Sequence, residues 1–192
     1  MYKIDELSTL MKYAANGNMP PVGDVSQSDE VLGFAYGLYF DEQGQLASPG
    51  PVNEAIADFV VSDEVLRSKN MTLQEELAVA IEKKEPKLAD QIDTLSTIKK
   101  PGVAFNTHEL LTTAKPGLVE RGVGSLAVVA FRYHLPRAAA QVRKAGFNVS
   151  TPNMSGVGDF DPNSPQEWTR NQRAWIKRER VALAAFALLG RI

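Results

Sequence analysis

Three side chains able to do chemistry follow directly on the most apolar short segment of the chain. Residues 126–131 read LAVVAF, and Arg132, His134 and Arg137 come just after this run. Arginine can hold a phosphate or carboxylate with two parallel hydrogen bonds, and an imidazole titrates near neutral pH. The spacing predicts a site for an anion, with His134 as acid or base. In the alternative interpretation, the arginines pair with surface acids and the histidine packs at the strand end.

A second polar group, Asn106, Thr107 and Glu109, has the residue types of a helix start. Asparagine followed three residues later by glutamate is the spacing of a capping box, which explains Asn106 and Glu109 without any ligand. A polar cap at the carboxyl edge of a sheet can also face a ligand. We therefore predict that all three residues contact the same ligand as the arginines.

Gly33 and Tyr133 complete the predicted site. Residues 30–40, EVLGFAYGLYF, are typical of a strand buried on both faces, and Gly33 and Gly37 interrupt that run. A glycine within a strand marks a bend or a close approach of backbone or ligand. We expect Gly33 to admit a ligand, and Tyr133 to line the site between its two polar neighbours.

The elements that must position these residues alternate along the chain, which favours βαβ units around a mostly parallel sheet of about five strands. The predicted class is a three-layer, Rossmann-like α/β fold with an N-terminal helix and a long C-terminal helix. A single domain covers residues 1–192, and residues 1–25 form a helical extension. Strands are expected at 30–40, 64–68, 91–98, 126–131 and 147–150.

Helix signals fall between these strands. A break or kink is expected at Pro116, and a helix near Pro136 should offer unpaired backbone N–H groups to an anion. Ligands of open α/β sheets bind outside the carboxyl ends of the strands, where the predicted site residues gather. Helices are expected near residues 7–14, over 53–61, from a capping box at Thr72, from Asn106 to Arg121, over 136–145, and from Ser164 to Leu189.

Composition excludes several classes of function. The chain has 192 residues, a formal net charge of −2 and no cysteine, which rules out disulfides, thiolate metal sites and cysteine nucleophiles. The balanced charge argues against a nucleic-acid partner. No apolar run approaches the roughly 20 residues of a membrane span, so we expect a cytoplasmic protein with no membrane partner.

Two common catalytic motifs are absent, which argues against two further classes of enzyme. Neither a GxSxG nucleophile elbow nor a GxxxxGK[ST] phosphate loop is present. We predict no metal site, because the run Gly158-Asp-Phe-Asp161 is explained by an Asp-Pro turn. The basic residues of the C-terminal helix are interpreted as a solvated face, and Trp168 and Trp175 as core anchors.

The motifs Asn106-Thr107-x-Glu109 and Tyr133-His134-x-x-Arg137 flank the apolar run, and the second is followed by a helix ending in Ala-Gly-Phe. In this the chain resembles the bacterial domain-of-unknown-function family of YdcF/SanA/ElyC-like proteins. The resemblance implies a Rossmann-like fold with a polar pocket, and no settled reaction. Residues 35–51 depart from the family's compact glycine-rich turn, so dinucleotide binding is not predicted.

Together these patterns predict a protein that binds a small anionic compound, nucleotide-type or phosphorylated, with turnover at His134 if it is an enzyme. A non-catalytic binding or sensor domain would use the same pocket. A scaffold protein would use the polar motifs only as caps and salt bridges. The sequence indicates neither a cofactor nor an oligomeric state.

Overall fold

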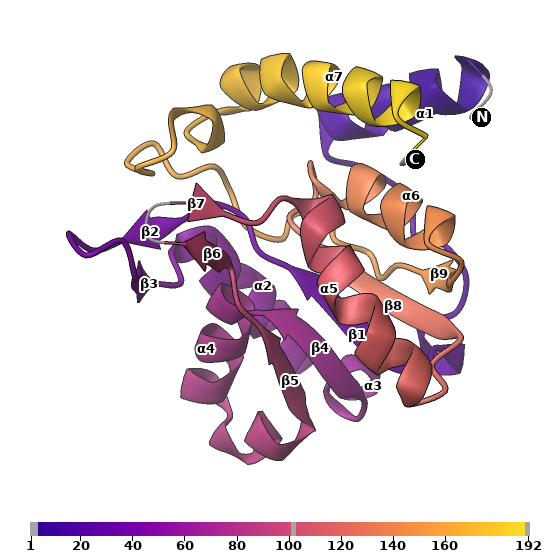
Figure 1. The fold of residues 1–192 in the computed structure, drawn as a ribbon, viewed down its shortest axis with the longest axis vertical. Helices are drawn as coiled ribbons and strands as arrows, with labels where there is room; N and C mark the ends of the chain where they lie inside the picture. The colour runs from indigo at the N-terminus through magenta and orange to yellow at the C-terminus, as the bar shows by residue number, and fades with distance from the viewer. Residues whose placement is uncertain (1–3, 101–102, 191–192) are drawn as a thin grey trace.

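Five parallel strands form the central sheet of the protein (Figure 1). The structure is a computed structural model that describes residues 4–100 and 103–190. The sheet and its helix layers confirm the predicted α/β class. In spatial order the strands are β5 (Ile92–Leu95), β4 (Asn70–Gln74), β1 (Glu30–Phe34), β8 (Ser125–Ala130) and β9 (Asn148–Ser150).

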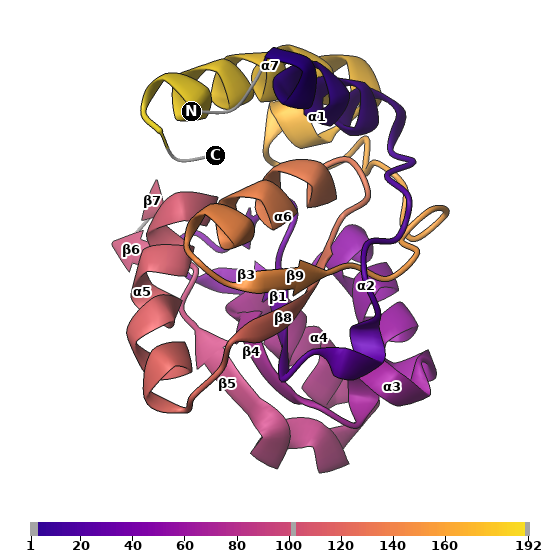
Figure 2. The same ribbon diagram turned by 90° about the vertical axis from the view of Figure 1, so that its right-hand side faces the viewer.

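Helices cover both faces of this sheet (Figure 2). One pair packs on one face and a second pair on the other, which gives the predicted three layers. The N-terminal and C-terminal helices lie side by side beyond the second pair and close that side of the molecule. The pairs are α2 (Pro51–Ser62) with α4 (Glu75–Lys84), α5 (Thr107–Glu120) with α6 (Leu135–Lys144), and α1 (Ile4–Asn16) with α7 (Gln172–Leu188).

The strand order contains one reversal of direction. The chain builds outward from β1 through β4 to β5, then returns to place β8 on the other side of β1 and β9 beyond it. Loops leaving the carboxyl ends of β1 and β8 therefore run to opposite faces of the sheet. Such a topological switch point leaves a crevice, which is where open α/β sheets bind ligands.

The core explains why β1 and β8 occupy the centre. Every residue of β1 is buried, and so is β8 from Leu126 onward, as expected for strands covered on both faces. Smaller elements lie outside this core. They are η1 (Val25–Gln27), β2 (Tyr39–Phe40), β3 (Leu46–Ser48), α3 (Glu64–Arg67), η2 (Pro86–Gln91), β6 (Ile98–Lys100), β7 (Val103–Ala104) and η3 (Glu167–Thr169).

The second predicted strand and the helix expected from Thr72 are both wrong. Residues 64–67 form α3, because the Asp63 side chain caps its amino end by accepting from the backbone N–H groups of Val65 and Leu66. The second strand instead spans 70–74. Thr72 lies inside it, where its hydroxyl donates to Glu30, and α4 begins only at Glu75.

The predicted strand 30–40 ends early, at Phe34. The next two backbone N–H groups donate to side chains and not to the backbone of a neighbouring strand. That of Ala35 donates to Oε1 of Gln74 at 2.9 Å, and that of Tyr36 donates to Oδ1 of Asn53 at 2.8 Å. Gly37 then takes a positive φ of 76° and turns the chain away from the sheet.

Two helix predictions also need correction. The C-terminal helix does not begin at Ser164, whose hydroxyl is hydrogen-bonded to that of Thr169 in a single turn. It begins at Gln172, where the Asn171 side chain accepts from the N–H of Ala174. The break expected in α5 is absent, since the helix continues through Pro116.

Among the described residues, none of the helices combines the length and apolarity that crossing a membrane requires.

Candidate ligand site at the switch point

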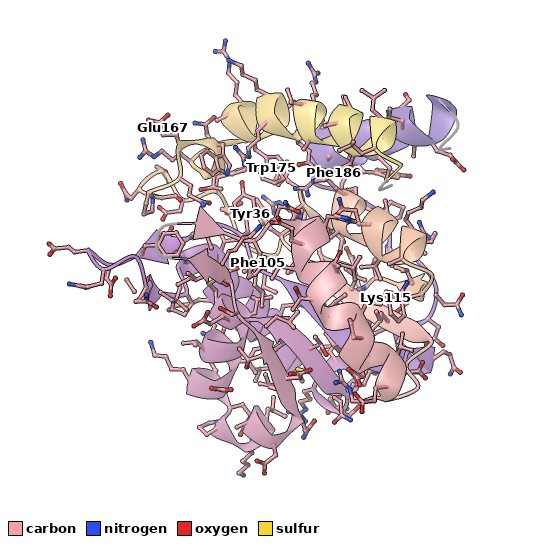
Figure 3. The ribbon with its side chains drawn as sticks, viewed as in Figure 1. Tyr36, Phe105, Lys115, Glu167, Trp175 and Phe186 are labelled. Atoms are coloured by element: carbon pink, nitrogen blue, oxygen red, sulfur yellow. The ribbon has the colours of Figure 1, made fainter. Side chains whose placement is uncertain are left out.

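A cavity of about 450 Å³ opens at the carboxyl edge of the sheet. Its floor is formed by the loop after β1 and by the first turns of α5 and α6, and its roof by η3 and α7. Figure 3 shows Trp175 and Phe186 on the underside of α7, above Tyr36 and Phe105. The cavity therefore lies at the topological switch point.

Four predicted site residues meet in this cavity. Asn106 and Thr107 reach it from the start of α5, and His134 and Arg137 from the start of α6. His134 and Arg137 follow β8 of the parallel sheet, whereas Asn106 and Thr107 follow β7 of the antiparallel pair β6–β7, so the tertiary fold brings the two pairs of residues together. The structure thus supports the predicted convergence for these four residues.

Thr107 connects the polar side chains of the cavity. Its hydroxyl oxygen accepts from Nη1 of Arg137 at 3.0 Å and lies 3.2 Å from Nε2 of His134. Nε of Arg137 donates to Oε1 of Glu179 at 2.7 Å, which links α6 to the roof helix. Thr107, His134, Arg137 and Glu179 are each buried, so the network is shielded from water.

Burial sets the charges of this network. It holds the pKa of His134 well below its usual value, and the Arg137 guanidinium lowers that pKa further, so the imidazole is neutral at physiological pH. Burial also raises the pKa of Glu179, although Arg137 and Arg178 favour its ionised form. The Arg137–Glu179 ion pair therefore adds no net charge to the cavity.

Arg178 supplies a second cation. Its guanidinium carbon lies 3.9 Å from the centre of the Trp168 ring, a stacking distance for a cation on an indole face. It forms no ion pair within residues 4–100 and 103–190. Partial burial and then the nearby Arg137 lower its pKa, and the carboxylate of Glu179 partly opposes this shift.

Three buried polar atoms of lining residues lack a hydrogen-bond partner in the part of the chain that the structure describes. They are Oη of Tyr36, Nδ1 of His134 and Oε2 of Glu179. An unpaired buried polar group costs about 1–3 kcal/mol. Native proteins retain few such groups, and these three belong to residues that line one cavity, although the atoms themselves are buried.

Comparison with known proteins identifies no relative. The chain matches no family model, no curated protein and no solved structure. The resemblance to the YdcF/SanA/ElyC-like family stays a prediction, and the site is interpreted from its geometry alone.

Two predicted site residues lie outside the cavity. Nη2 of Arg132 donates to the exposed carboxylate of Asp159 at 2.6 Å, so this arginine pairs with a surface acid. The Tyr133 ring packs against Gly17 and against Phe160, with ring centroids 4.8 Å apart in the latter contact. The predicted pair of arginines at one anion is therefore not formed by Arg132 and Arg137.

Gly33 and Glu109 also have structural roles away from the cavity. A Cβ on Gly33 would lie 2.5 Å from Cδ2 of Leu73, so the glycine lets the Leu73 side chain pack close to β1. Glu109 completes the capping box with Asn106 and pairs with Lys99 at 3.0 Å. The capping box is confirmed.

The start of α6 does not offer the expected cluster of free N–H groups. The backbone N–H groups of His134 and Leu135 both donate to the carbonyl oxygen of Phe131, and Pro136 has no N–H. The tight turn after β8 therefore satisfies these donors internally.

The contribution of α7 to the cavity was not predicted from the sequence. Trp175, Glu179 and Leu183 are four residues apart and are the buried residues of that helix. A glutamate on an otherwise apolar stripe signals a buried ion pair, and that signal was available in the sequence.

Among the described residues, no group of three His, Asp or Glu side chains is placed to hold a metal ion.

Proposed function

We propose that this protein binds a small aromatic anion, of the nucleotide type, in the switch-point cavity. The observation that carries the proposal is the coincidence of a cation, Arg178 stacked on Trp168, with several aromatic rings around a single cavity. Small-molecule sites span roughly 300–1,000 Å³, so a cavity of about 450 Å³ is of suitable size.

Four half-buried rings are available to a planar ligand. Each keeps part of its surface exposed while lining the cavity, unlike Tyr36 and Trp175, whose rings pack on each other with centroids 4.9 Å apart. Stacking on aromatic side chains is worth about 1–3 kcal/mol per base. The four rings belong to Phe40, Phe105, Trp168 and Phe186.

The acidic group of the ligand is assigned to Arg178. Arg137 is already paired with Glu179, whereas Arg178 is stacked on Trp168 and forms no ion pair among the described residues, although Glu179 is near enough to raise its pKa. A guanidinium next to an indole ring can still make two parallel hydrogen bonds to a carboxylate or phosphate through its free edge. The ring and the acid of the ligand would thus lie against neighbouring residues of η3 and α7.

His134 is assigned to hydrogen bonding. General acid–base catalysis works best when the pKa lies near the working pH, and burial holds the pKa of His134 well below that range. The neutral imidazole instead holds the Thr107 hydroxyl in the wall of the cavity. A binding or sensor protein is therefore favoured over an enzyme that uses His134 as acid or base.

Calorimetric titration with adenosine monophosphate, adenosine and inorganic phosphate tests the proposal. We expect the nucleotide to bind more tightly than the nucleoside, and phosphate alone to bind least, because both the rings and Arg178 contribute. Arg178→Ala should weaken nucleotide binding about tenfold or more, which corresponds to the loss of a charge-assisted hydrogen bond.

Arg132→Ala is the matched control, because Arg132 pairs with Asp159 outside the cavity. It should leave nucleotide affinity unchanged. Binding that survives Arg178→Ala, or that depends equally on Arg132, would contradict the assignment. If neither nucleotides nor aromatic carboxylates shift the melting temperature, the proposed class of ligand is wrong.

A further inference from the structure

The outer side of α7 is a surface that no described element covers. Helices α1 and α7 lie side by side at one end of the molecule, and α7 packs inward over the cavity (Figure 1, Figure 2). Trp175, Glu179 and Leu183 are its buried residues. We call the opposite side the outer face of α7. Its residues recur every three or four positions and are all exposed, and they are Arg173, Lys177, Arg180, Val181 and Ala184.

Positive charge is concentrated on this face. Residues 170–190 contain five Lys or Arg residues and one carboxylate, a net charge of +4 in a chain whose formal net charge is −2. That carboxylate is Glu179, which is 2% exposed and pairs with an arginine of α6 on the inner side. Arg173, Lys177 and Arg180 form no ion pair among the described residues. The outer face therefore presents three cations and no carboxylate, which suits an anionic partner.

Apolar side chains lie among these cations. Val181 is 69% exposed, and it lines a shallow hollow on α7 together with Ile176 and the three cations. No Asp or Glu lines this hollow in the part of the chain that the structure describes. When such a surface meets an anionic bilayer, the apolar groups enter the headgroup region and the cations are attracted to the lipid phosphates. The two kinds of side chain then stabilise the same complex.

Other occupants fit the outer face less well. A second copy of the chain would bring the same three cations together across a two-fold axis, where like charges repel. A nucleic acid would leave Ile176 and Val181 against a hydrated phosphate backbone, and the outer face has no aromatic ring on which a base could stack. The exposed side of a helix is convex, so it suits a planar surface better than a small molecule.

We propose that the outer face of α7 binds the surface of an anionic phospholipid bilayer. Arg173, Lys177 and Arg180 interact with the lipid phosphates, and Val181 enters the headgroup region. The proposal differs from the solvated face and the lack of a membrane partner that were expected from the sequence. It does not depend on the proposed function of the cavity, because no residue of the outer face lines that cavity.

Cosedimentation of the full chain with lipid vesicles tests the proposal. We expect binding to vesicles of phosphatidylcholine mixed with phosphatidylserine, and little binding to vesicles of phosphatidylcholine alone. Binding should weaken as salt is added, because ions screen charges at an exposed surface. Lys177→Gln should weaken binding to the mixed vesicles about fivefold, the value of one basic side chain near an anionic membrane.

Lys83→Gln is the matched control. It removes the same charge from an exposed position of α4, at the other end of the molecule (Figure 1), and should leave vesicle binding unchanged. Both lysines are exposed, so neither substitution should alter the melting temperature, which shows that the variants are folded.

Val181→Thr tests the apolar part of the outer face. The substitution keeps the shape of the side chain and replaces a methyl group with a hydroxyl. It should weaken binding to the mixed vesicles several-fold, because the methyl group enters the headgroup region. Binding of soluble polyglutamate, which offers charge without a bilayer, should be weaker than vesicle binding and should not change in this variant.

Three results would overturn the proposal. The absence of binding to the mixed vesicles at low salt would exclude the bilayer as partner. Equal losses in Lys177→Gln and Lys83→Gln would show general charge attraction with no role for the outer face. Binding of polyglutamate or of a DNA duplex as tight as vesicle binding, and unchanged in Val181→Thr, would assign the face to an acidic protein or a nucleic acid.

Discussion

Arg137 donates to Glu179 at 2.7 Å, and this buried ion pair joins the sheet-facing helix α6 to the roof helix α7. The two side chains are 10% and 3% exposed. The pair thus holds the roof over the cavity in addition to orienting the Thr107 hydroxyl through the second nitrogen of Arg137. Stability and ligand binding should both depend on it.

Removing one partner of this pair should be costly. We expect Glu179→Ala to reduce the free energy of unfolding by about 3–5 kcal/mol, because it leaves the Arg137 charge buried and uncompensated. Urea denaturation measures the change. Arg132→Ala is the matched control, since the carboxylate of its partner Asp159 is 88% exposed, and its effect should stay below about 1 kcal/mol. Similar losses in the two variants would contradict the buried role of the pair.

Thr107→Val tests the hydroxyl that connects α5 to α6. The substitution keeps the shape of the side chain and leaves Nη1 of Arg137 and Nε2 of His134 without this partner. We expect the free energy of unfolding to fall by about 1–3 kcal/mol, and nucleotide affinity to fall with it. Thr113→Val is the control in the same helix, because its exposed hydroxyl donates only to the backbone of Glu109. If Thr107→Val lowered the free energy of unfolding no more than Thr113→Val does, the Thr107 hydroxyl would not be a stabilising link between α5 and α6.

The sheet and half of the site could be predicted from the sequence for physical reasons. Apolar runs such as 126–131 identify buried strands, and polar residues directly after them fall at the carboxyl edge of a parallel sheet. His134 and Arg137 follow that rule after β8, whereas Asn106 and Thr107 follow β7 of the separate antiparallel pair β6–β7 and reach the cavity from the capped start of α5. Local spacing was sufficient because each residue is fixed by the element next to it.

The remainder depended on contacts distant in sequence. Whether Arg132 faces the cavity or the surface is decided by Asp159, which lies 27 residues further along the chain. The early end of β1 is decided by Gln74 and Asn53, whose side chains bind the backbone of the next two residues. Helix α7 reaches the cavity only through tertiary packing. No local sequence pattern therefore predicted that Arg178 lines the cavity.

Gly33 gives a test that separates packing from ligand contact. Gly33→Ala would bring a methyl group to 2.5 Å from Leu73 Cδ2 and 3.0 Å from Leu77 Cδ1. We expect a loss of about 1–3 kcal/mol in unfolding free energy from overpacking, with nucleotide affinity unchanged. Gly124→Ala is the control, since its new methyl group would have nothing nearer than 3.9 Å. If Gly33→Ala instead weakened nucleotide binding without lowering the free energy of unfolding, Gly33 would be a ligand contact, as the sequence predicted.

Glu76 should make the stability of the protein depend on pH. The side chain is fully buried at the start of α4, where its Oε2 accepts from the Thr97 hydroxyl and its Oε1 has no partner in the described chain. Burial raises its pKa from 4.5 to about 7, an effect that the Thr97 hydrogen bond only partly opposes. The folded protein therefore keeps this proton to a higher pH than the unfolded chain does.

The sign of the effect follows from proton binding. Between pH 4.5 and about 7 the folded state binds more protons at Glu76 than the unfolded state, so the free energy of unfolding falls as the pH rises. The full loss is about 3 kcal/mol, since each pKa unit is worth about 1.4 kcal/mol. Glu76→Gln stays neutral at every pH. It should remove this slope and raise stability at pH 8, measured by urea denaturation across pH 4 to 8. Glu64→Gln is the control, because that carboxylate is 88% exposed, and it should leave the slope in place. A slope that persists in Glu76→Gln would assign the pH dependence to another group.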